Sequence, residues 1–168
     1  MGPQLSAIPK GKTIFIDANI FLYEIFDHPI FGENSHRIFK DVENGHLQGL
    51  TSTLVLDEVF YKMMLMEASN KFHIPLKDAS SYLKRNYHRI TVLTDSRKNI
   101  QKIQRINNLE IKGISPEIFE MSTEIAETNM LLPHDASHLA VMRFTGLSDI
   151  ATNDSDFERV AGIRVWRP

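Results

Sequence analysis

The stretch Thr13-Ile14-Phe15-Ile16-Asp17 sets the expectation for the fold. Four β-branched or aromatic residues in succession predict a short buried strand, and the acidic residue comes directly after it. Residues 18–26 then have the pattern of a helix, which ends at His28-Pro29. The chain therefore begins with a strand that leads through an acidic residue into a helix.

The same alternation continues along the chain. Further strands are expected at 47–51, 92–93, 111–114, 149–152 and 163–166. Helices are expected at 32–44, from 53 up to a break at 69–75, and then at 76–86, 97–107, 116–127 and 133–144. Strands that alternate with helices predict a parallel sheet with helices on both faces.

Length and composition narrow the class of protein. With 168 residues, the chain suits one domain at 13–168, preceded by an N-terminal extension at 1–12. The absence of cysteine excludes disulfides, zinc–thiolate sites and thiol catalysis. No apolar run reaches the roughly 18 residues that span a bilayer, and residues 1–12 do not resemble a signal peptide. We expect a cytoplasmic protein without a membrane segment.

Charge is distributed unevenly. The net charge of −2 gives no overall attraction to nucleic acid, but residues 84–105 carry a net charge of +6. This stretch is either a solvated helix face or a surface that contacts an RNA backbone. Its basic residues are Lys84, Arg85, Arg89, Arg97, Lys98, Lys102 and Arg105.

Four acidic residues occupy related positions. Asp17 ends the first strand, and Asp154 follows the strand at 149–152. Glu58 lies one to two turns into a helix that follows a strand, and Asp135 lies in the first turn of another helix. In an open parallel sheet, the carboxyl ends of strands and the adjacent helix N-termini face one crevice. We expect the four carboxylates to meet there.

Such a cluster favours a bound cation. Two carboxylates about 5 Å apart repel by roughly 3 kcal/mol at an effective dielectric near 20, so several together either hold protons or recruit a metal. Oxygen ligands without cysteine favour a hard ion, Mg²⁺ or alternatively Mn²⁺. A magnesium site of this kind suits phosphodiester hydrolysis by a metal-activated water.

Each acid also has a purely structural explanation. Asp17 could cap a helix, and Glu58 could be a surface acid like its neighbour Asp57. Asp135 could favour the helix dipole, and Asp154 could be a turn residue. The functional interpretation depends on the combination, since four separate strand ends or helix starts each carry an acid.

Four segments resemble the motifs of PIN domains, in the same order along the chain. They are Phe15-Ile16-Asp17-Ala18-Asn19-Ile20-Phe21-Leu22-Tyr23, Leu56-Asp57-Glu58-Val59, Pro133-His134-Asp135-Ala136-Ser137-His138-Leu139-Ala140 and Ile150-Ala151-Thr152-Asn153-Asp154-Ser155-Asp156-Phe157. Residues 160–166 are similar to the closing strand of that family. The resemblance covers nearly the whole chain.

The resemblance implies a three-layer α/β/α sandwich around a mostly parallel sheet. It also implies metal-dependent endonucleolytic cleavage of RNA, as in the VapC toxins of toxin–antitoxin pairs. A VapC-like protein would usually form a homodimer and be silenced by a small antitoxin. One or two Mg²⁺ ions would be held by Asp17, Glu58, Asp135 and Asp154. Asn19 and Thr152 would orient ligands or substrate, and Asp156 would either assist through water or serve only in its loop.

Several alternatives remain open. The chain is longer than a compact VapC toxin, which leaves room for a PIN nuclease in RNA processing. A catalytically silent PIN scaffold that binds RNA or protein, and a structure-selective DNA nuclease, are further possibilities. His138 either packs inside its helix layer or approaches the phosphate, and a zinc pair with His134 does not fit the oxygen-rich surroundings.

The remaining apolar residues are interpreted mainly as core. They include Phe144, Phe157 and Trp166. Phe21, Leu22 and Tyr23 are expected either in the core or in contacts between the two chains of a dimer. The methionines Met63, Met64 and Met66 are also expected in the core, with contact to a partner chain as the alternative.

Overall fold

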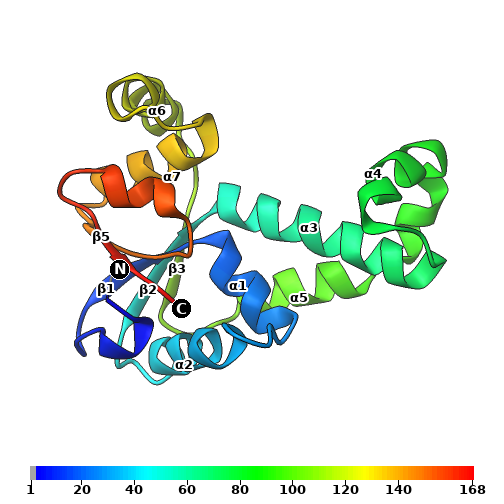
Figure 1. The fold of residues 1–168 in the computed structure, drawn as a ribbon, viewed down its shortest axis with the longest axis horizontal. Coiled ribbons are helices and arrows are strands. Elements are labelled where there is room, and N and C mark those ends of the chain that lie inside the picture. The colour runs from blue at the N-terminus through cyan, green and yellow to red at the C-terminus, as the bar shows by residue number, and fades with distance from the viewer. Residues whose placement is uncertain (1–2) are drawn as a thin grey trace.

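A computed structural model describes residues 3–168. Over that range one sheet has the order β3-β2-β1-β4-β5, and every neighbouring pair of strands is parallel (Figure 1). The predicted parallel sheet is therefore confirmed. Its strands are β1 (Thr13–Ile16), β2 (Gln48–Ser52), β3 (Leu109–Lys112), β4 (Asp149–Ala151) and β5 (Arg164–Trp166).

The helices form two layers around this sheet. The chain runs from β1 outward to β2 and β3, and then returns past β1 to β4. Since parallel crossovers are right-handed, the helices of the outward and return crossovers lie on opposite faces, as Figure 1 shows. The predicted three-layer α/β/α sandwich is confirmed. The outward crossovers contain α1 (Ala18–Ile25), α2 (Gly32–Glu43), α3 (Thr53–Phe72), α4 (Leu76–Arg85) and α5 (Asp95–Ile103), and the return crossover contains α6 (Pro116–Asn129) and α7 (Pro133–Phe144).

The first strand is apolar on both faces because it is covered on both. Ile14, Phe15 and Ile16 are fully buried. Phe15 packs towards α7, while Ile16 lies on the face that carries α2, close to Gly49 of β2. A methyl group added at Gly49 would lie 2.8 Å from a methyl carbon of Leu109, so glycine allows β2 and β3 to pack closely.

The longest helix, α3, carries a small lobe away from the sheet (Figure 1). The helix begins at the N-cap Ser52, whose hydroxyl accepts from the amide of Val55, and it ends at His73, which has φ of 53°. It therefore continues to Phe72, and the predicted break from residue 69 is wrong for 69–72. We call residues 76–93 the α4 lobe; its buried contacts form a separate cluster of Ala68, Ala79, Leu83 and Leu93.

The predictions for residues 92–93 and 97–107 differ from the structure. Residues 87–92 form the 3-10 helix η2 (Tyr87–Val92), and Leu93 is buried in the lobe, so the strand predicted at 92–93 is absent. Helix α5 begins and ends earlier than the predicted 97–107. Its first amides, those of Asp95 and Ser96, donate to the carboxylate of Glu67 at 3.2 and 2.9 Å. This cap comes from α3, so the local sequence did not reveal it.

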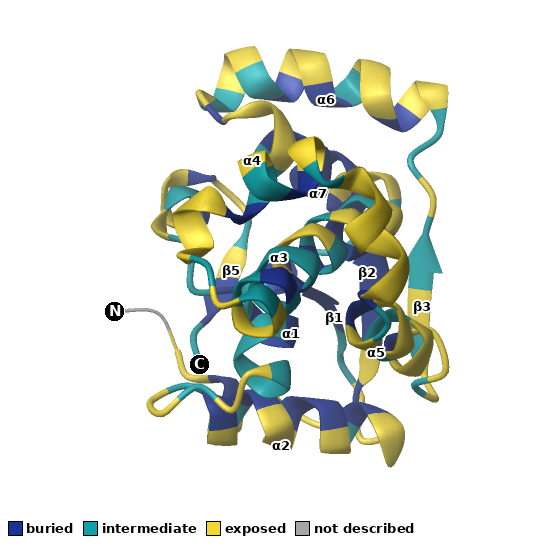
Figure 2. Cartoon of the chain, turned by 90° about the vertical axis from the view of Figure 1, so that its right-hand side faces the viewer, coloured by how far each residue is buried: buried dark blue, intermediate teal, exposed yellow. Residues whose placement is uncertain are grey.

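Burial confirms part of the predicted core (Figure 2), including Phe21. Phe157 and Trp166 are buried, and so is Met63, whereas Met64 and Met66 are partly exposed. Phe144 is 40% exposed, so its assignment to the core is wrong; the Lys112 ammonium lies 5.5 Å from its ring centroid.

The first described residues pack beside the residues that follow the last strand. Leu5, in the 3-10 helix η1 (Leu5–Ala7), is buried, and its amide donates to the carbonyl of Arg167 at 2.7 Å. The N-terminal extension predicted at 1–12 thus packs on the domain over its described part, and residues 1 and 2 lie outside the described residues. Among residues 3–168, no helix is long and apolar enough to cross a membrane.

Candidate active site

Asp17 lies at the point where β1 becomes α1. The side chain is 9% exposed, and its carboxylate accepts from the amide of Ala18 at 2.6 Å, so Asp17 does cap α1. The same carboxylate also accepts from the Thr152 hydroxyl at 2.6 Å and from the Asn19 amide. The structural and functional interpretations of Asp17 are therefore compatible, because the cap uses one oxygen and the other faces β4.

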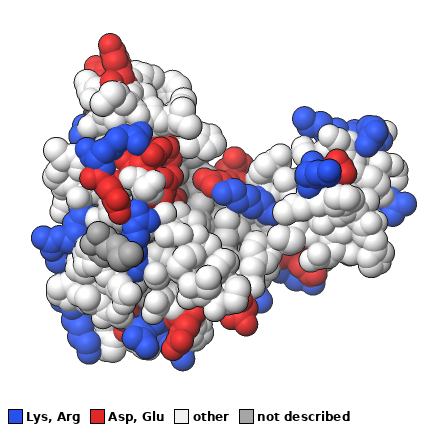
Figure 3. Space-filling view, in the orientation of Figure 1, with Lys and Arg blue, Asp and Glu red and all other residues white. Residues whose placement is uncertain are grey.

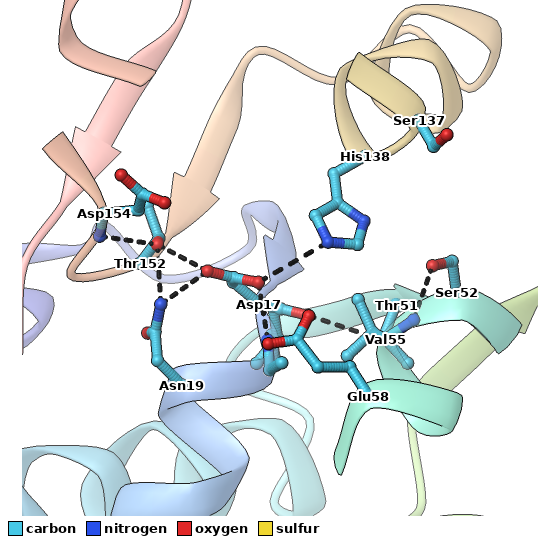
Figure 4. Close-up of polar contacts among 12 residues, drawn as sticks. Asp17, Asn19, Thr51, Ser52, Val55, Glu58, Ser137, His138, Thr152 and Asp154 are labelled. Atoms are coloured by element: carbon cyan, nitrogen blue, oxygen red, sulfur yellow. Dashed lines mark hydrogen bonds and ion pairs between the residues drawn. The ribbon is translucent and has the colours of Figure 1, made fainter. Parts of the chain in front are cut away.

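Thr152 and Asn19 join the ends of β1 and β4 (Figure 4). Thr152 Oγ1 donates to Asp17 and accepts from the backbone amide of Asp154 at 2.9 Å and from Asn19 Nδ2 at 3.0 Å. Asn19 Oδ1 in turn accepts from the backbone amide of Asn153 at 3.1 Å. The two residues predicted to orient ligands thus hold Asp17 and the loop that carries Asp154.

Strand order explains why the acids meet here. β1 and β4 are neighbours in the sheet, but the chain leaves β1 towards β2 and leaves β4 towards β5, in the opposite direction. Loops that diverge from adjacent parallel strands open a crevice at their carboxyl ends. We call this crevice the switch point, and Asp17 and Asp154 lie at its two sides. The sequence around these two residues does not reveal the strand order.

Glu58 approaches this crevice from α3. Its carboxylate is half-buried and faces Asp17 in Figure 4, while the adjacent Asp57 is exposed. The expectation that the two neighbouring acids diverge on the helix is confirmed. Glu58 Oε1 accepts from the ammonium of Lys62, one turn further along α3, at 2.6 Å.

Asp135 lies near several other acids. It lies in the first turn of α7 and, together with Glu58, lines a surface hollow of about 490 Å³. The pKa of Asp135 is raised from 3.8 to about 6, first by burial and then by the negative charges of nearby acids, which are Asp154, Asp156, Asp17 and Glu58. The predicted acids are therefore within electrostatic reach of one another, and Figure 3 shows acidic side chains gathered on this side of the molecule.

His138 lies beneath Asp17. Its ring is buried 5.7 Å from the ring of Phe15, and its Nε2 atom lies 3.8 Å from Asp17 Oδ1. The packing interpretation of His138 is confirmed, while His134 is exposed. Burial lowers the pKa of the imidazole, although the Asp17 charge opposes this, and burial raises the pKa of Asp17. The contact with Asp17 was not predicted, because it depends on how α7 packs on β1.

The donor atoms around Asp17 suit a hard cation. The four acids supply carboxylate oxygens, whereas Asn19 and His138 turn nitrogen atoms, Nδ2 and Nε2, towards Asp17. The negative charges of the neighbouring acids contribute, after burial, to the raised pKa of Asp135. As the side chains stand, no three His, Asp or Glu residues within 3–168 are grouped closely enough to coordinate one ion. The outer acids Glu58 and Asp156 instead pair with Lys62 at 2.6 Å and Arg159 at 2.7 Å.

Asp154 and Asp156 share one turn. The Asp154 carboxylate caps η3 (Ser155–Arg159) by accepting from the Asp156 amide at 2.8 Å, so the turn interpretation of Asp154 is correct as well. Asp156 Oδ1 accepts from Arg159, whose other nitrogen donates to the carbonyl of Met130 at 2.7 Å. Arg159 thereby ties η3 to the turn before α7.

The basic stretch at 84–105 is not gathered around the acids. Lys84 and Arg85 lie on α4 and Arg89 on η2, all in the α4 lobe at the far end of α3 (Figure 1). Arg97, Lys98 and Lys102 lie on α5, and Arg105 follows it. All seven side chains are exposed. Their contact with an RNA backbone stays a prediction.

Comparison with known proteins agrees with this geometry. The PIN domain profile matches residues 14–163. Ribonuclease VapC6 of Methanocaldococcus jannaschii is 29% identical over 158 residues, which are 92% of this chain and 96% of that protein.

Solved structures with low sequence identity share the fold. The Sarcin-Ricin loop cleaving toxin VapC20 of Mycobacterium tuberculosis has a TM-score of 0.61 at 16% identity, over 91% of this chain and 98% of that chain. The VapBC2 complex of Rickettsia felis, bound to a DNA fragment from its promoter, gives 0.60 at 16% identity, over 92% and 98%. Since the profile matches residues 14–163, which are most of the chain and include all four acidic segments, this chain belongs to the PIN domain family.

Proposed function

We propose that this protein is a magnesium-dependent endoribonuclease and the toxin of a VapBC-type toxin–antitoxin pair. The proposal is supported by the placement of four acids from separate segments around one crevice: Thr152 joins Asp17 to the loop of Asp154, and Glu58, which faces Asp17, lines one hollow with Asp135. A relative of nearly equal length is named a ribonuclease, which favours RNA over DNA as the substrate.

The four acids would hold one or two Mg²⁺ ions, with Mn²⁺ as a substitute. Asp17 is the most rigidly held of them, because Thr152, Asn19 and the Ala18 amide all donate to it. Glu58, Asp135 and Asp154 would complete the set, and Asp156 would act at its edge. Bound there, the ion would activate the attacking water and offset the charge that develops on the phosphate. The protein then needs no side-chain nucleophile.

The proposed biological role adds a protein partner. Solved relatives of the same fold include VapBC2 and a toxin–antitoxin complex from Klebsiella pneumoniae, which supports a small antitoxin as the partner of this chain. A homodimer is proposed from the resemblance to VapC toxins alone. Co-expression provides the test: production of this chain alone should arrest growth, and the candidate antitoxin should restore it. Normal growth with an active enzyme would favour a PIN nuclease in RNA processing.

Cleavage of RNA tests the enzymatic proposal directly. Wild-type protein should cleave RNA with Mg²⁺ and lose this activity in chelator, and Asp17→Asn should lower the rate by about a thousandfold or more. The matched pair is Glu58→Gln and Asp57→Asn, since these neighbouring acids face different ways and only the first lies at the crevice. Glu58→Gln should be inactive and Asp57→Asn close to wild type.

Three outcomes would contradict the proposal. Equal cleavage by all variants would show that the acids are not the active site. Binding of RNA and Mg²⁺ without turnover would identify a silent PIN scaffold. Preferential cleavage of DNA oligonucleotides in competition with RNA would identify a DNA nuclease built on the same acids.

A further inference from the structure

Lys62 is a cation in direct contact with the acidic cluster, and the proposed reaction has given it no role. It lies on α3 one turn after Glu58, and its Nζ donates to Glu58 Oε1 at 2.6 Å. The side chain is 50% exposed, and Glu58 is its one hydrogen-bond partner among the described residues. Arg159, the other cation paired with an acid of the cluster, is fixed by both Asp156 and the Met130 carbonyl.

The pairing of Lys62 with Glu58 is easily exchanged. An exposed ion pair between residues i and i+4 of a helix contributes only about 0.3–0.5 kcal/mol. The proposed function also assigns Glu58 to a divalent ion, which competes with the ammonium for the same carboxylate. Lys62 is therefore held near the site by a weak contact that metal binding would weaken further.

The hollow beside Lys62 is lined by negative charges and, among the described residues, by no Lys or Arg. Glu58 and Asp135 line the hollow of about 490 Å³ together with Leu132, Pro133 and His134, and no Lys or Arg is among these lining residues. A strand of RNA that enters the hollow would meet two carboxylates, which repel its phosphates. The exposed ammonium of Lys62, which contacts the lining residue Glu58, can bind a phosphate oxygen there.

We propose that Lys62 leaves Glu58 and binds a backbone phosphate of the RNA strand in this hollow when Glu58 becomes a metal ligand. This inference rests on the proposed function and names the residue that admits the substrate. It differs from the prediction for the basic stretch, whose Lys84 and Arg85 lie in the α4 lobe at the far end of α3.

The test compares Lys62→Met with Lys71→Met, since both residues are exposed lysines on α3. Lys71 donates to the carbonyl of Val92, away from the acids. The first measurement is Mn²⁺ binding to the metal-free full-length protein. Lys62→Met should bind Mn²⁺ about three- to tenfold more tightly, because a positive charge beside the ion is removed. Lys71→Met should bind Mn²⁺ like wild type.

The second measurement is the affinity for a fluorescent single-stranded RNA in chelator, in the Glu58→Gln background. That change removes the carboxylate that holds Lys62 and should strengthen RNA binding relative to wild type. Adding Lys62→Met should abolish the gain and reduce the slope of log affinity against log salt by about 0.7, the loss of one phosphate contact. Adding Lys71→Met should change neither quantity.

The opposite signs of the two effects separate this role from structural damage, which would weaken metal and RNA binding together. Unchanged RNA affinity and salt slope in Lys62→Met would overturn the inference. A loss of RNA affinity in Lys84→Met, with none in Lys62→Met, would also overturn it. Failure of the proposed function would look different, since wild-type protein would then not cleave RNA at all.

Discussion

The hydroxyl of Thr152 donates a hydrogen bond of 2.6 Å to Asp17 Oδ2 and so joins two neighbouring strand ends that are 135 residues apart in sequence. The same oxygen accepts from Asn19 and from the amide of Asp154. One small side chain thus fixes the relative positions of the two acids at the switch point. Residues that orient metal ligands in this way commonly affect metal affinity or activity by 10–100-fold.

Replacement of this hydroxyl should therefore damage the site. Thr152→Val keeps the shape of the side chain but leaves the buried Asp17 carboxylate without one donor, so we expect a loss of about 2 kcal/mol in stability and at least about tenfold in cleavage rate. Thr152→Ser keeps the hydroxyl and should stay close to wild type. Denaturant unfolding and RNA cleavage measure the two effects, and equal behaviour of Val and Ser variants would contradict the role of the hydrogen bond.

The raised pKa of Asp135 predicts how the stability of the metal-free protein depends on pH. Its pKa of about 6 lies above the value of 3.8 expected in the unfolded chain, so the folded state binds its proton more strongly. The metal-free protein should therefore gain stability from this group as the pH falls from about 6 towards 4.

Asp135→Asn removes the repelled charge. At pH 8 in chelator the variant should melt about 2–4 °C above wild type, for a gain of about 1 kcal/mol after allowance for solvent screening of a half-exposed carboxylate. The difference should shrink as the pH falls from 6 to 4. A lower melting temperature for the variant at pH 8 would mean that the acids do not repel one another as inferred.

The lowered pKa of Asp149, which lies outside the candidate active site, predicts the opposite dependence of stability on pH. Lys12 and Trp166 each donate to its carboxylate at 2.7 Å. Burial alone would raise the pKa of Asp149, but these hydrogen bonds and the Lys12 charge outweigh it and lower the pKa below 3.8. The stabilisation is therefore present above pH 4 and is lost as the pH falls through the folded-state pKa.

Asp149→Asn tests this, since the amide oxygen can still accept from Trp166. We expect a loss of about 1–3 kcal/mol at pH 7 that diminishes as the pH falls below 3.8 towards 3, because the carboxyl of the unfolded wild-type chain then takes up a proton. Urea unfolding at both pH values gives the comparison, with the exposed Asp57→Asn as control. A loss of the same size at pH 3 would assign the effect to packing rather than charge.

The α4 lobe should unfold more easily than the sheet. Leu83 is buried in the separate lobe cluster, and Leu83→Ala should cost about 2–4 kcal/mol there. Because that cluster is distinct from the main core, faster amide hydrogen exchange should be confined mainly to residues 76–93, with cleavage retained. Leu50→Ala, in the main core, should instead accelerate exchange across the sheet. Global acceleration by Leu83→Ala would show that the lobe and sheet are one unit.

Much of the fold followed from short-range patterns. The apolar run at 13–16 predicted β1, and Ser115-Pro116 marked the start of α6, because strand burial and helix capping depend on residues close in sequence. The cap of α5 by Glu67 and the burial of Leu93 in the α4 lobe were missed. Both depend on α3, which packs beside these residues only in the folded protein.

Apart from the strand wrongly predicted at 92–93, the sequence by itself determined the order of strands and helices along the chain, and it revealed the four acidic segments, since each depends on a few consecutive residues. Only the tertiary structure decided that β1 and β4 are neighbours, that His138 lies under Asp17, and that Asp135 has a raised pKa. These are properties of distances between groups far apart in sequence. Such distances are fixed by how whole layers pack, because burial and charge–charge repulsion depend on spatial separation and not on spacing along the chain.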